Sequence, residues 1–210
     1  MVKIVKKRAS GNLFIKKSNF ISHIFPIKND KEAKIVIRKV RLKNKKANHC
    51  AFAYTSGRKH ENQGISDDKE PSGTAGKPIL DSIYKNHLIN VLIIVVRYFG
   101  GIKLGSGGLI RAYSKSASLA IKKTKAFNLK LYKEYKVVLD YSFYKKFLYY
   151  GKIYNIVIEK TWFTNRITVI IAVEFKNCFK IISKLKNMFA GKAQIIKLKR
   201  KWLPEKAKKY

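Results

Sequence analysis

An apolar stretch near the middle of the chain, residues 89–99 (INVLIIVVRYF), constrains the fold more than any other feature. A nearly uninterrupted β-branched run of this kind is expected for a central strand that is covered on both faces. Five glycines follow within the nine residues 100–108, and a helix is predicted from about Ser106 to Lys125. The apolar stripe of that helix is expected to contain Ile110, Tyr113, Ala117, Ala120 and Ile121. The sequence therefore predicts a buried strand, a tight turn and a helix in direct succession.

The rest of the first half is predicted to supply further strands and two helices around this unit. Residues 13–27 favour extended structure, and residues 47–54 favour a strand. Asn29-Asp30-Lys31-Glu32 is a capping-box pattern, so a helix is expected to begin there. Residues 55–73 are polar and glycine-rich and are predicted to form one long loop, followed by a short helix over residues 75–85.

The second half has its own succession of elements. We expect a strand at 134–140, a helix at 142–151, a hairpin formed by 154–163 and 166–175, a helix at 177–189 and a strand at 193–200. The order β-α-β-β-α-β is that of the ferredoxin-like split βαβ unit. The fold class is therefore predicted to be α+β, with one domain at 1–127 and a ferredoxin-like domain at 128–210.

The charge of the chain is strongly positive and points to a polyanionic partner. The 210 residues include 47 Lys and Arg against 12 Asp and Glu, a formal net charge of +35, and both halves are basic. Neutralising phosphates releases counterions and favours association with nucleic acid. A compositional origin is an equal alternative, because only 8 of the 47 basic residues are Arg and the chain is also rich in residues with AT-rich codons.

Cysteine content and hydropathy favour a cytoplasmic protein. Cys50 and Cys178 lie far apart, each among apolar residues, as is typical of buried thiols in a reducing compartment. The N-terminal residues are basic but lack the apolar core of a signal peptide, and the longest apolar run is too short to cross a bilayer. We therefore expect no membrane association.

The segment RYFGGIKLGSGGLIRAY, residues 97–113, is named here the glycine-rich turn. Glycine lets backbone N–H groups approach a ligand closely, and a helix N-terminus adds unpaired donors and a positive dipole end, so the segment suits an anion. Lys103 can reach over it, and Arg97 and Arg111 flank it. The glycine spacing fits neither the P-loop nor the G-x-G-x-x-G pattern. The alternative is a tight turn whose glycines only allow close packing.

The segment SDDKEPSGTAGKP, residues 66–78, is named here the acidic loop. Asp67, Asp68 and Glu70 fall within four positions of a very basic chain. They could hold Mg²⁺ or supply a general base. Alternatively, they cap turns and the following helix or orient basic side chains of the glycine-rich turn, which is the interpretation favoured by the absence of a histidine in the cluster.

Aromatic residues are concentrated in the helix predicted at 142–151 and beside it. Such rings could stack on nucleic acid bases. Packing of the helix on a sheet explains most of them more simply. The residues are Tyr141, Phe143, Tyr144, Phe147, Tyr149 and Tyr150.

The acidic loop and the stretch VVRYFGGIKLGSGGLIRAY, in this order and at this separation, resemble the IMPACT/YigZ family, with weaker matches at KSNFISHIFP and HCAFAY. The resemblance implies an N-terminal two-layer α/β sandwich of the ribosomal-protein domain-2-like type and a C-terminal domain akin to the last domain of elongation factor G. It also implies contact with RNA or the ribosome, because both of these fold relatives work on the ribosome. Lys69 departs from the family pattern, which usually has Gly there. The residues carried over as a shared surface are Asp67, Asp68, Glu70, Gly76, Lys77, Arg97, Gly100, Gly101, Gly105, Gly107, Gly108 and Arg111, with Lys103 as a looser match.

Two functions are consistent with these features. The first is a non-enzymatic RNA- or ribosome-binding protein linked to translation regulation, which grips phosphates with the glycine-rich turn, Lys77, Lys103 and the flanking arginines. The second is a Mg²⁺-dependent enzyme acting on a phosphorylated small molecule or nucleotide, with the acidic loop at its centre. We expect no cofactor for the first, and a protein partner is a further possibility.

Overall fold

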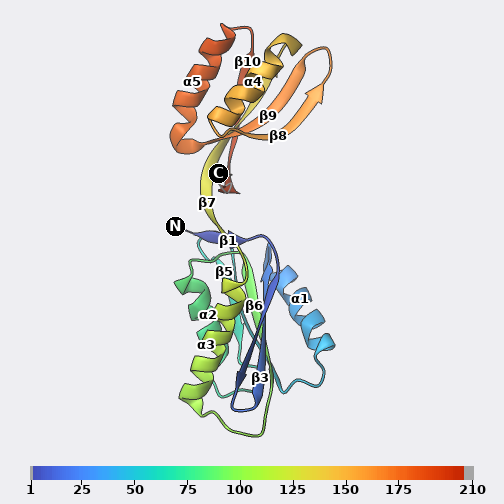
Figure 1. The fold of residues 1–210 in the computed structure, drawn as a ribbon, viewed down its shortest axis with the longest axis vertical. Helices are drawn as coiled ribbons and strands as arrows, with labels where there is room; N and C mark the ends of the chain where they lie inside the picture. Colours follow the sequence, from blue (N-terminus) through green and yellow to red (C-terminus); the bar gives the residue numbers. More distant parts are fainter. Residues whose placement is uncertain (1, 206–210) are drawn as a thin grey trace. The chain divides into compact units, whose positions relative to one another are not determined.

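A computed structural model describes residues 2–205, which divide into two units at residues 128 and 129 (Figure 1). The first unit carries the glycine-rich turn and the acidic loop. The second carries the β-α-β-β-α-β succession. No helix of the described residues is long and apolar enough to span a membrane.

The first unit is built on an antiparallel sheet of five strands in the order β2-β3-β6-β4-β5. Their bounds are β2 Ala9–Ile15, β3 Ser18–Pro26, β6 Val91–Tyr98, β4 His49–Ser56 and β5 Asn62–Ser66. The central position of β6 confirms the prediction made from its apolar run.

Two predictions for the first unit are wrong. Residues 13–27 are split by a turn at Lys16 and Lys17, and the long loop expected at 55–73 contains β5.

Helices cover both faces of this sheet (Figure 1). Along β6, Val91, Ile93 and Val95 pack with α2 (Gly76–Lys85) and α3 (Ser106–Lys122). The alternate residues of β6 pack on the opposite side with α1 (Asp30–Lys43), because successive side chains of a strand point to opposite faces. The unit therefore has three layers, and the expectation of a two-layer sandwich is wrong.

A local signal explains where α1 begins, and the burial of side chains shows which face of α3 packs against the sheet. The Asn29 side chain accepts a hydrogen bond from the Glu32 N–H at 3.0 Å and caps α1, as the capping-box pattern predicts. In α3 the predicted stripe is wrong at Ile110, which is 43% exposed. Leu109 and Ala112 are buried instead, so the buried stripe is rotated toward these residues.

The second unit has a sheet in the order β10-β7-β9-β8, with α4 and α5 packed on one face. The bounds are β7 Ala126–Leu139, α4 Tyr141–Ile153, β8 Val157–Phe163, β9 Ile167–Glu174, the 3-10 turn Phe175–Asn177, α5 Cys178–Phe189 and β10 Gln194–Pro204. The predicted order of elements is confirmed. β7 is longer than expected: its first three residues pair with β1 (Lys3–Val5) in the first unit, and residues 129–133 pair with residues 200–204 of β10.

Candidate functional site

The entrance of the glycine-rich turn is fixed to the first unit. The Phe99 N–H donates to the Asn48 side chain at 2.8 Å, and the Gly100 N–H donates to the Ser18 hydroxyl at 3.2 Å. A Cβ at Gly100 would lie 2.1 Å from the carbonyl carbon and oxygen of Lys17, so only glycine fits there. These two amides are therefore not available to a ligand.

Beyond Gly100 the turn is open to solvent. Gly101 and Gly105 have positive φ values of 84° and 70°, and nothing lies within 4 Å of a Cβ built on either. α3 then begins at Ser106 without a side-chain cap, and its first backbone bond is donated by the Leu109 N–H to the Gly105 carbonyl at 2.9 Å. The intervening first turn of the helix is largely exposed. Its N–H groups point out of the helix end and can bind an anion.

Two basic side chains accompany this open helix end. Lys103 and Arg111 are both exposed. Arg111 folds back along the first turn, since its Nη1 lies 3.5 Å from a Cβ built at Gly107. Lys77 is also exposed but pairs with Asp81 on α2 at 3.1 Å, and no hydrogen bond or ion pair among residues 2–205 joins it to the other two. Of the predicted basic side chains, Lys103 and Arg111 therefore accompany the turn.

Arg97 does not belong to this surface, which corrects the prediction for that residue. It is 4% exposed, and its Nη1 pairs with Glu70 Oε1 at 2.7 Å. Its guanidinium also donates to the Ser18 hydroxyl and lies 5.2 Å from the ring centre of Phe20. Arg97 therefore holds the acidic loop and β3 together beneath the turn.

Glu70 is the centre of a buried polar cluster. Besides Arg97, it accepts a hydrogen bond from the Tyr113 hydroxyl at 2.7 Å, and His49 Nε2 lies 3.7 Å from the same oxygen. Burial, followed by the charge of Glu70, raises the pKa of Tyr113 far above its ordinary value, so this hydroxyl stays protonated and donates. Tyr113 lies on α3, and the cluster thus connects the acidic loop to both elements that flank the glycine-rich turn.

Asp68 joins the acidic loop to α1 and β4. Its carboxylate accepts the Cys50 N–H at 2.6 Å and pairs with Arg41 at 2.7 Å, while its carbonyl contacts His49 Nδ1 at 2.9 Å. Two of the three carboxylates of the acidic loop, those of Asp68 and Glu70, are therefore bound by donors of the protein itself.

Asp67 organises the loop from within. Its carboxylate accepts the N–H groups of Gly73, Ala75 and Gly76 at 2.8 to 2.9 Å, which closes the loop and caps the start of α2. Burial would raise the pKa of Asp67, but the N–H donors, that of Gly73 first, outweigh it and lower the pKa below its ordinary value of 3.8. Asp67 therefore has the capping role that was one of the interpretations of the acidic loop.

The depressed pKa predicts a pH-dependent contribution to stability. A carboxylate with a lowered folded-state pKa stabilises the fold above its ordinary pKa, and this contribution is lost as pH falls through the folded value. We expect Asp67→Asn to lower the free energy of unfolding by about 2 kcal/mol at pH 7, because an amide accepts three N–H donors poorly. Urea unfolding at pH 7 and near pH 3 measures this, and a difference from wild type that persists unchanged in acid would contradict it.

The acidic loop as a metal centre has little support. No three His, Cys, Asp or Glu side chains of residues 2–205 are grouped as metal ligands. The carboxylates of Asp67, Asp68 and Glu70 are occupied by the protein donors described above.

The side chains that fix the turn, Ser18 and Asn48, were not predicted from the sequence. Ser18 lies in one of the shorter segments of the resemblance, and Asn48 lies directly before the other.

Similarity to known proteins bears on this arrangement. Residues 16–121 match the Impact N-terminal domain, a segment that contains both the acidic loop and the glycine-rich turn. The protein YvyE of Bacillus subtilis, described as an IMPACT family member, is 37% identical over 172 residues, which make up 82% of this chain and 76% of YvyE. This chain belongs to the IMPACT family.

Other IMPACT family members share shorter segments. YigZ of Escherichia coli is 39% identical over 110 residues, 51% of this chain and 54% of YigZ, so the match spans about half the length of that relative. A crystal structure described as that of a hypothetical protein superposes with a TM-score of 0.60 and 26% identity, and covers 94% of this chain and 97% of its own. The IMPACT/YigZ resemblance is confirmed.

One departure from the IMPACT pattern has a structural consequence. Lys69, where the family usually has Gly, has a φ of +70°. A side chain in the left-handed region costs about 1 kcal/mol or more, whereas glycine adopts it freely. We expect Lys69→Gly to raise the free energy of unfolding by about 1 kcal/mol, measured by urea unfolding. A matched change at the exposed Lys39, in the interior of helix α1, should destabilise the protein by a similar amount; a loss of stability at position 69 would contradict the reasoning.

Proposed function

We propose that this protein binds RNA through the glycine-rich turn, with the exposed first turn of α3 receiving a phosphate. The observation that carries the proposal is the uncapped start of α3 at Ser106, preceded by residues 101–105, all of which are exposed except the half-buried Leu104. A helix end of this kind offers several N–H donors and a partial positive charge to an anion. Glycine at 107 adds no side chain of its own over these donors.

The side chains around the turn support a phosphate ligand. Lys103 and Arg111 are exposed and basic, and Arg111 already lies against the first turn at Gly107. Lys17, which sequence reasoning left out, adds an exposed lysine whose backbone lies against Gly100. An arginine and two lysines around one set of backbone donors match the charge of a nucleic acid backbone.

The carboxylates of the acidic loop do not neutralise the basic side chains around the turn, because they are bound elsewhere. Asp68 and Glu70 pair with Arg41 and Arg97, and Asp67 binds backbone groups. Residues 1–127 contain 27 basic and 7 acidic residues. A strongly basic unit attracts polyanions over a distance of about one Debye length, roughly 8 Å at physiological salt.

The partner in this proposal is ribosomal RNA, and the function is linked to translation. Support comes from membership of the IMPACT family and from the strand order β10-β7-β9-β8 of the second unit, which suits a ferredoxin-like domain akin to the last domain of elongation factor G. Fold likeness alone does not establish a function, so the proposal depends on the turn itself. The alternative of a Mg²⁺-dependent enzyme is disfavoured, because the carboxylates of the acidic loop are engaged within the protein.

A matched pair of double variants tests this function. Lys103→Ala with Arg111→Ala should weaken binding to single-stranded RNA on the order of tenfold and reduce the slope of log K against log salt by about 1 to 2. Lys122→Ala with Lys123→Ala removes the same charge at the opposite end of α3 and should have a much smaller effect. Filter binding across a salt series and co-sedimentation with ribosomes measure both. Equal losses for the two double variants would show a general lysine effect and overturn the proposal.

A further inference from the structure

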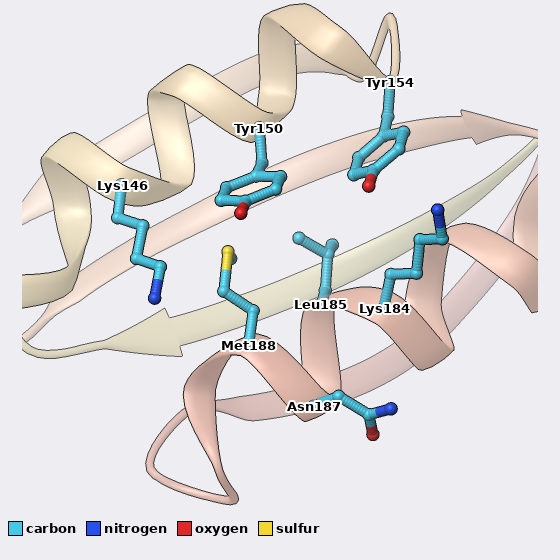
Figure 2. A pocket seen from close by; sticks show the side chains of 7 residues that line it. All are labelled: Lys146, Tyr150, Tyr154, Lys184, Leu185, Asn187 and Met188. Atoms are coloured by element: carbon cyan, nitrogen blue, oxygen red, sulfur yellow. The ribbon is translucent and has the colours of Figure 1, made fainter.

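A hollow opens between α4 and α5 of the second unit, far in sequence from the glycine-rich turn (Figure 2). Its volume is about 280 Å³. Tyrosine and lysine side chains line most of it, with Leu185 and Met188 between them. The lining residues are Lys146, Tyr150, Tyr154, Lys184, Leu185, Asn187 and Met188. This set is named here the α4–α5 groove.

Two aromatic rings and two cations line the groove: Lys146, Tyr150 and Tyr154 come from α4 and its C-terminal end, and Lys184 comes from α5. Tyr150 and Tyr154 lie nearly parallel, with ring centres 5.9 Å apart and an interplanar angle of 21°. Both are only half-buried, so part of each ring faces solvent. Figure 2 shows Lys146 and Lys184 toward opposite ends of the groove, with both tyrosine hydroxyls directed into it. Lys184 Nζ lies 5.1 Å from the Tyr154 ring centre.

The helices that form the groove carry six lysines and no acidic residue. Acidic residues of the same unit pair elsewhere: Glu134 and Glu159 with Lys201, and Asp140 with Arg166. No ion pair within residues 2–205 involves a lysine of α4 or α5. The helical face of the second unit thus keeps its positive charge.

We propose that the α4–α5 groove is a second RNA site, which binds one or two nucleotides of a single strand. A base would stack on the exposed ring surface of Tyr150 and Tyr154, and the flanking phosphates would contact Lys146 and Lys184. Aromatic side chains in a basic groove are the usual means by which proteins bind single strands without reading their sequence. The side-chain amide of Asn187 offers a donor and an acceptor to a base edge. The site rests on the RNA partner proposed above, but it does not depend on the glycine-rich turn.

The chain supplies matched controls on the same two helices. Lys145 and Lys186 are as exposed as Lys146 and Lys184 but do not line the groove. Tyr149 is 62% exposed, more than the half-buried Tyr150, and also lies outside it. If exposure alone determined RNA contact, the control residues would matter at least as much as the groove residues.

The experiment measures binding of the full chain to a fluorescent oligouridine by anisotropy. Lys146→Ala with Lys184→Ala, and separately Tyr150→Leu, should each weaken binding about tenfold. Lys145→Ala with Lys186→Ala, and Tyr149→Leu, should each change it less than twofold. Tyr150→Phe keeps the ring and should bind like wild type, which separates stacking from a folding defect. Heparin has no bases, so Tyr150→Leu should leave heparin binding unchanged.

The possible results distinguish the two RNA sites. If the control variants lose as much affinity as the groove variants, or if Tyr150→Leu weakens heparin binding equally, the groove site is overturned. If Lys103→Ala with Arg111→Ala weakens oligouridine binding while the groove variants do not, only the glycine-rich turn binds RNA. If the reverse holds, the groove site stands and the turn does not bind. A wild-type chain that fails to bind oligouridine at moderate salt would overturn both.

Discussion

Replacing Glu70 with alanine should lower the free energy of unfolding by about 3 to 5 kcal/mol, the largest effect that we expect from a single substitution. The change leaves the Arg97 guanidinium, 4% exposed, without its carboxylate, and the Tyr113 hydroxyl without its acceptor. An uncompensated buried charge is much more unfavourable than the loss of one surface ion pair. Urea unfolding followed by circular dichroism measures the change.

A second variant separates the buried charge from simple loss of packing. Glu70→Gln combined with Arg97→Met removes both charges while keeping similar volumes, and it should recover a large part of the stability lost in Glu70→Ala. Asp81→Ala, which breaks the exposed pair with Lys77, should cost less than 1 kcal/mol and serves as the surface control. If Glu70→Ala destabilised no more than Asp81→Ala, the assigned role of the buried cluster would be wrong.

Gly100→Ala should destabilise the protein by about 3 kcal/mol or more, because the added methyl group has no space. Its Cβ would lie 2.1 Å from the backbone of Lys17, so either the β2–β3 turn or the glycine-rich turn must move. The movement would also break the hydrogen bond from the Gly100 N–H to Ser18. Thermal unfolding reports the loss, and RNA binding by the folded fraction reports the displacement of the turn.

Gly101→Ala provides the comparison for this prediction. Nothing lies within 4 Å of a Cβ at Gly101, but its φ is +84°. The substitution should therefore cost only the strain of a left-handed residue, about 1 to 2 kcal/mol. Equal effects at positions 100 and 101 would show that backbone conformation, and not the contact with Lys17, determines why glycine is needed at 100.

Much of the fold could be predicted because the strongest patterns are local. The apolar run of β6 and the capping residue Asn29 identify their elements without knowledge of the rest of the chain. The number of layers could not be predicted from the pattern of α1, because this helix buries only Ala33 and Val40, leaves Ile35 and Leu42 exposed, and carries many charged residues. Whether such a helix covers a sheet depends on the other side of the interface, which sequence spacing does not reveal.

The candidate site was predictable in position but not in the role of each residue. The glycines and Lys103 lie at an exposed turn, as the pattern indicates. Arg97 differs because its partner, Glu70, lies 27 residues earlier, and the pairing is created by tertiary structure. One signal was present: Arg97 is the single charged residue of β6 and follows six apolar residues, and a charge in such a strand requires a buried partner. The α4–α5 groove could not be predicted either, because Lys184 reaches the Tyr154 ring only after the two helices pack together.

The measurement closest to the central claim is an RNA titration followed by the backbone amide resonances of the ¹⁵N-labelled protein. We expect the amides of Ser106, Gly107 and Gly108 to shift progressively as a short oligouridine is added, since these donors would receive the phosphate. The amides of Phe99 and Gly100, bonded to Asn48 and Ser18, should shift little. If the amides at 106–108 stayed unmoved at saturating RNA, the glycine-rich turn would not be a phosphate site.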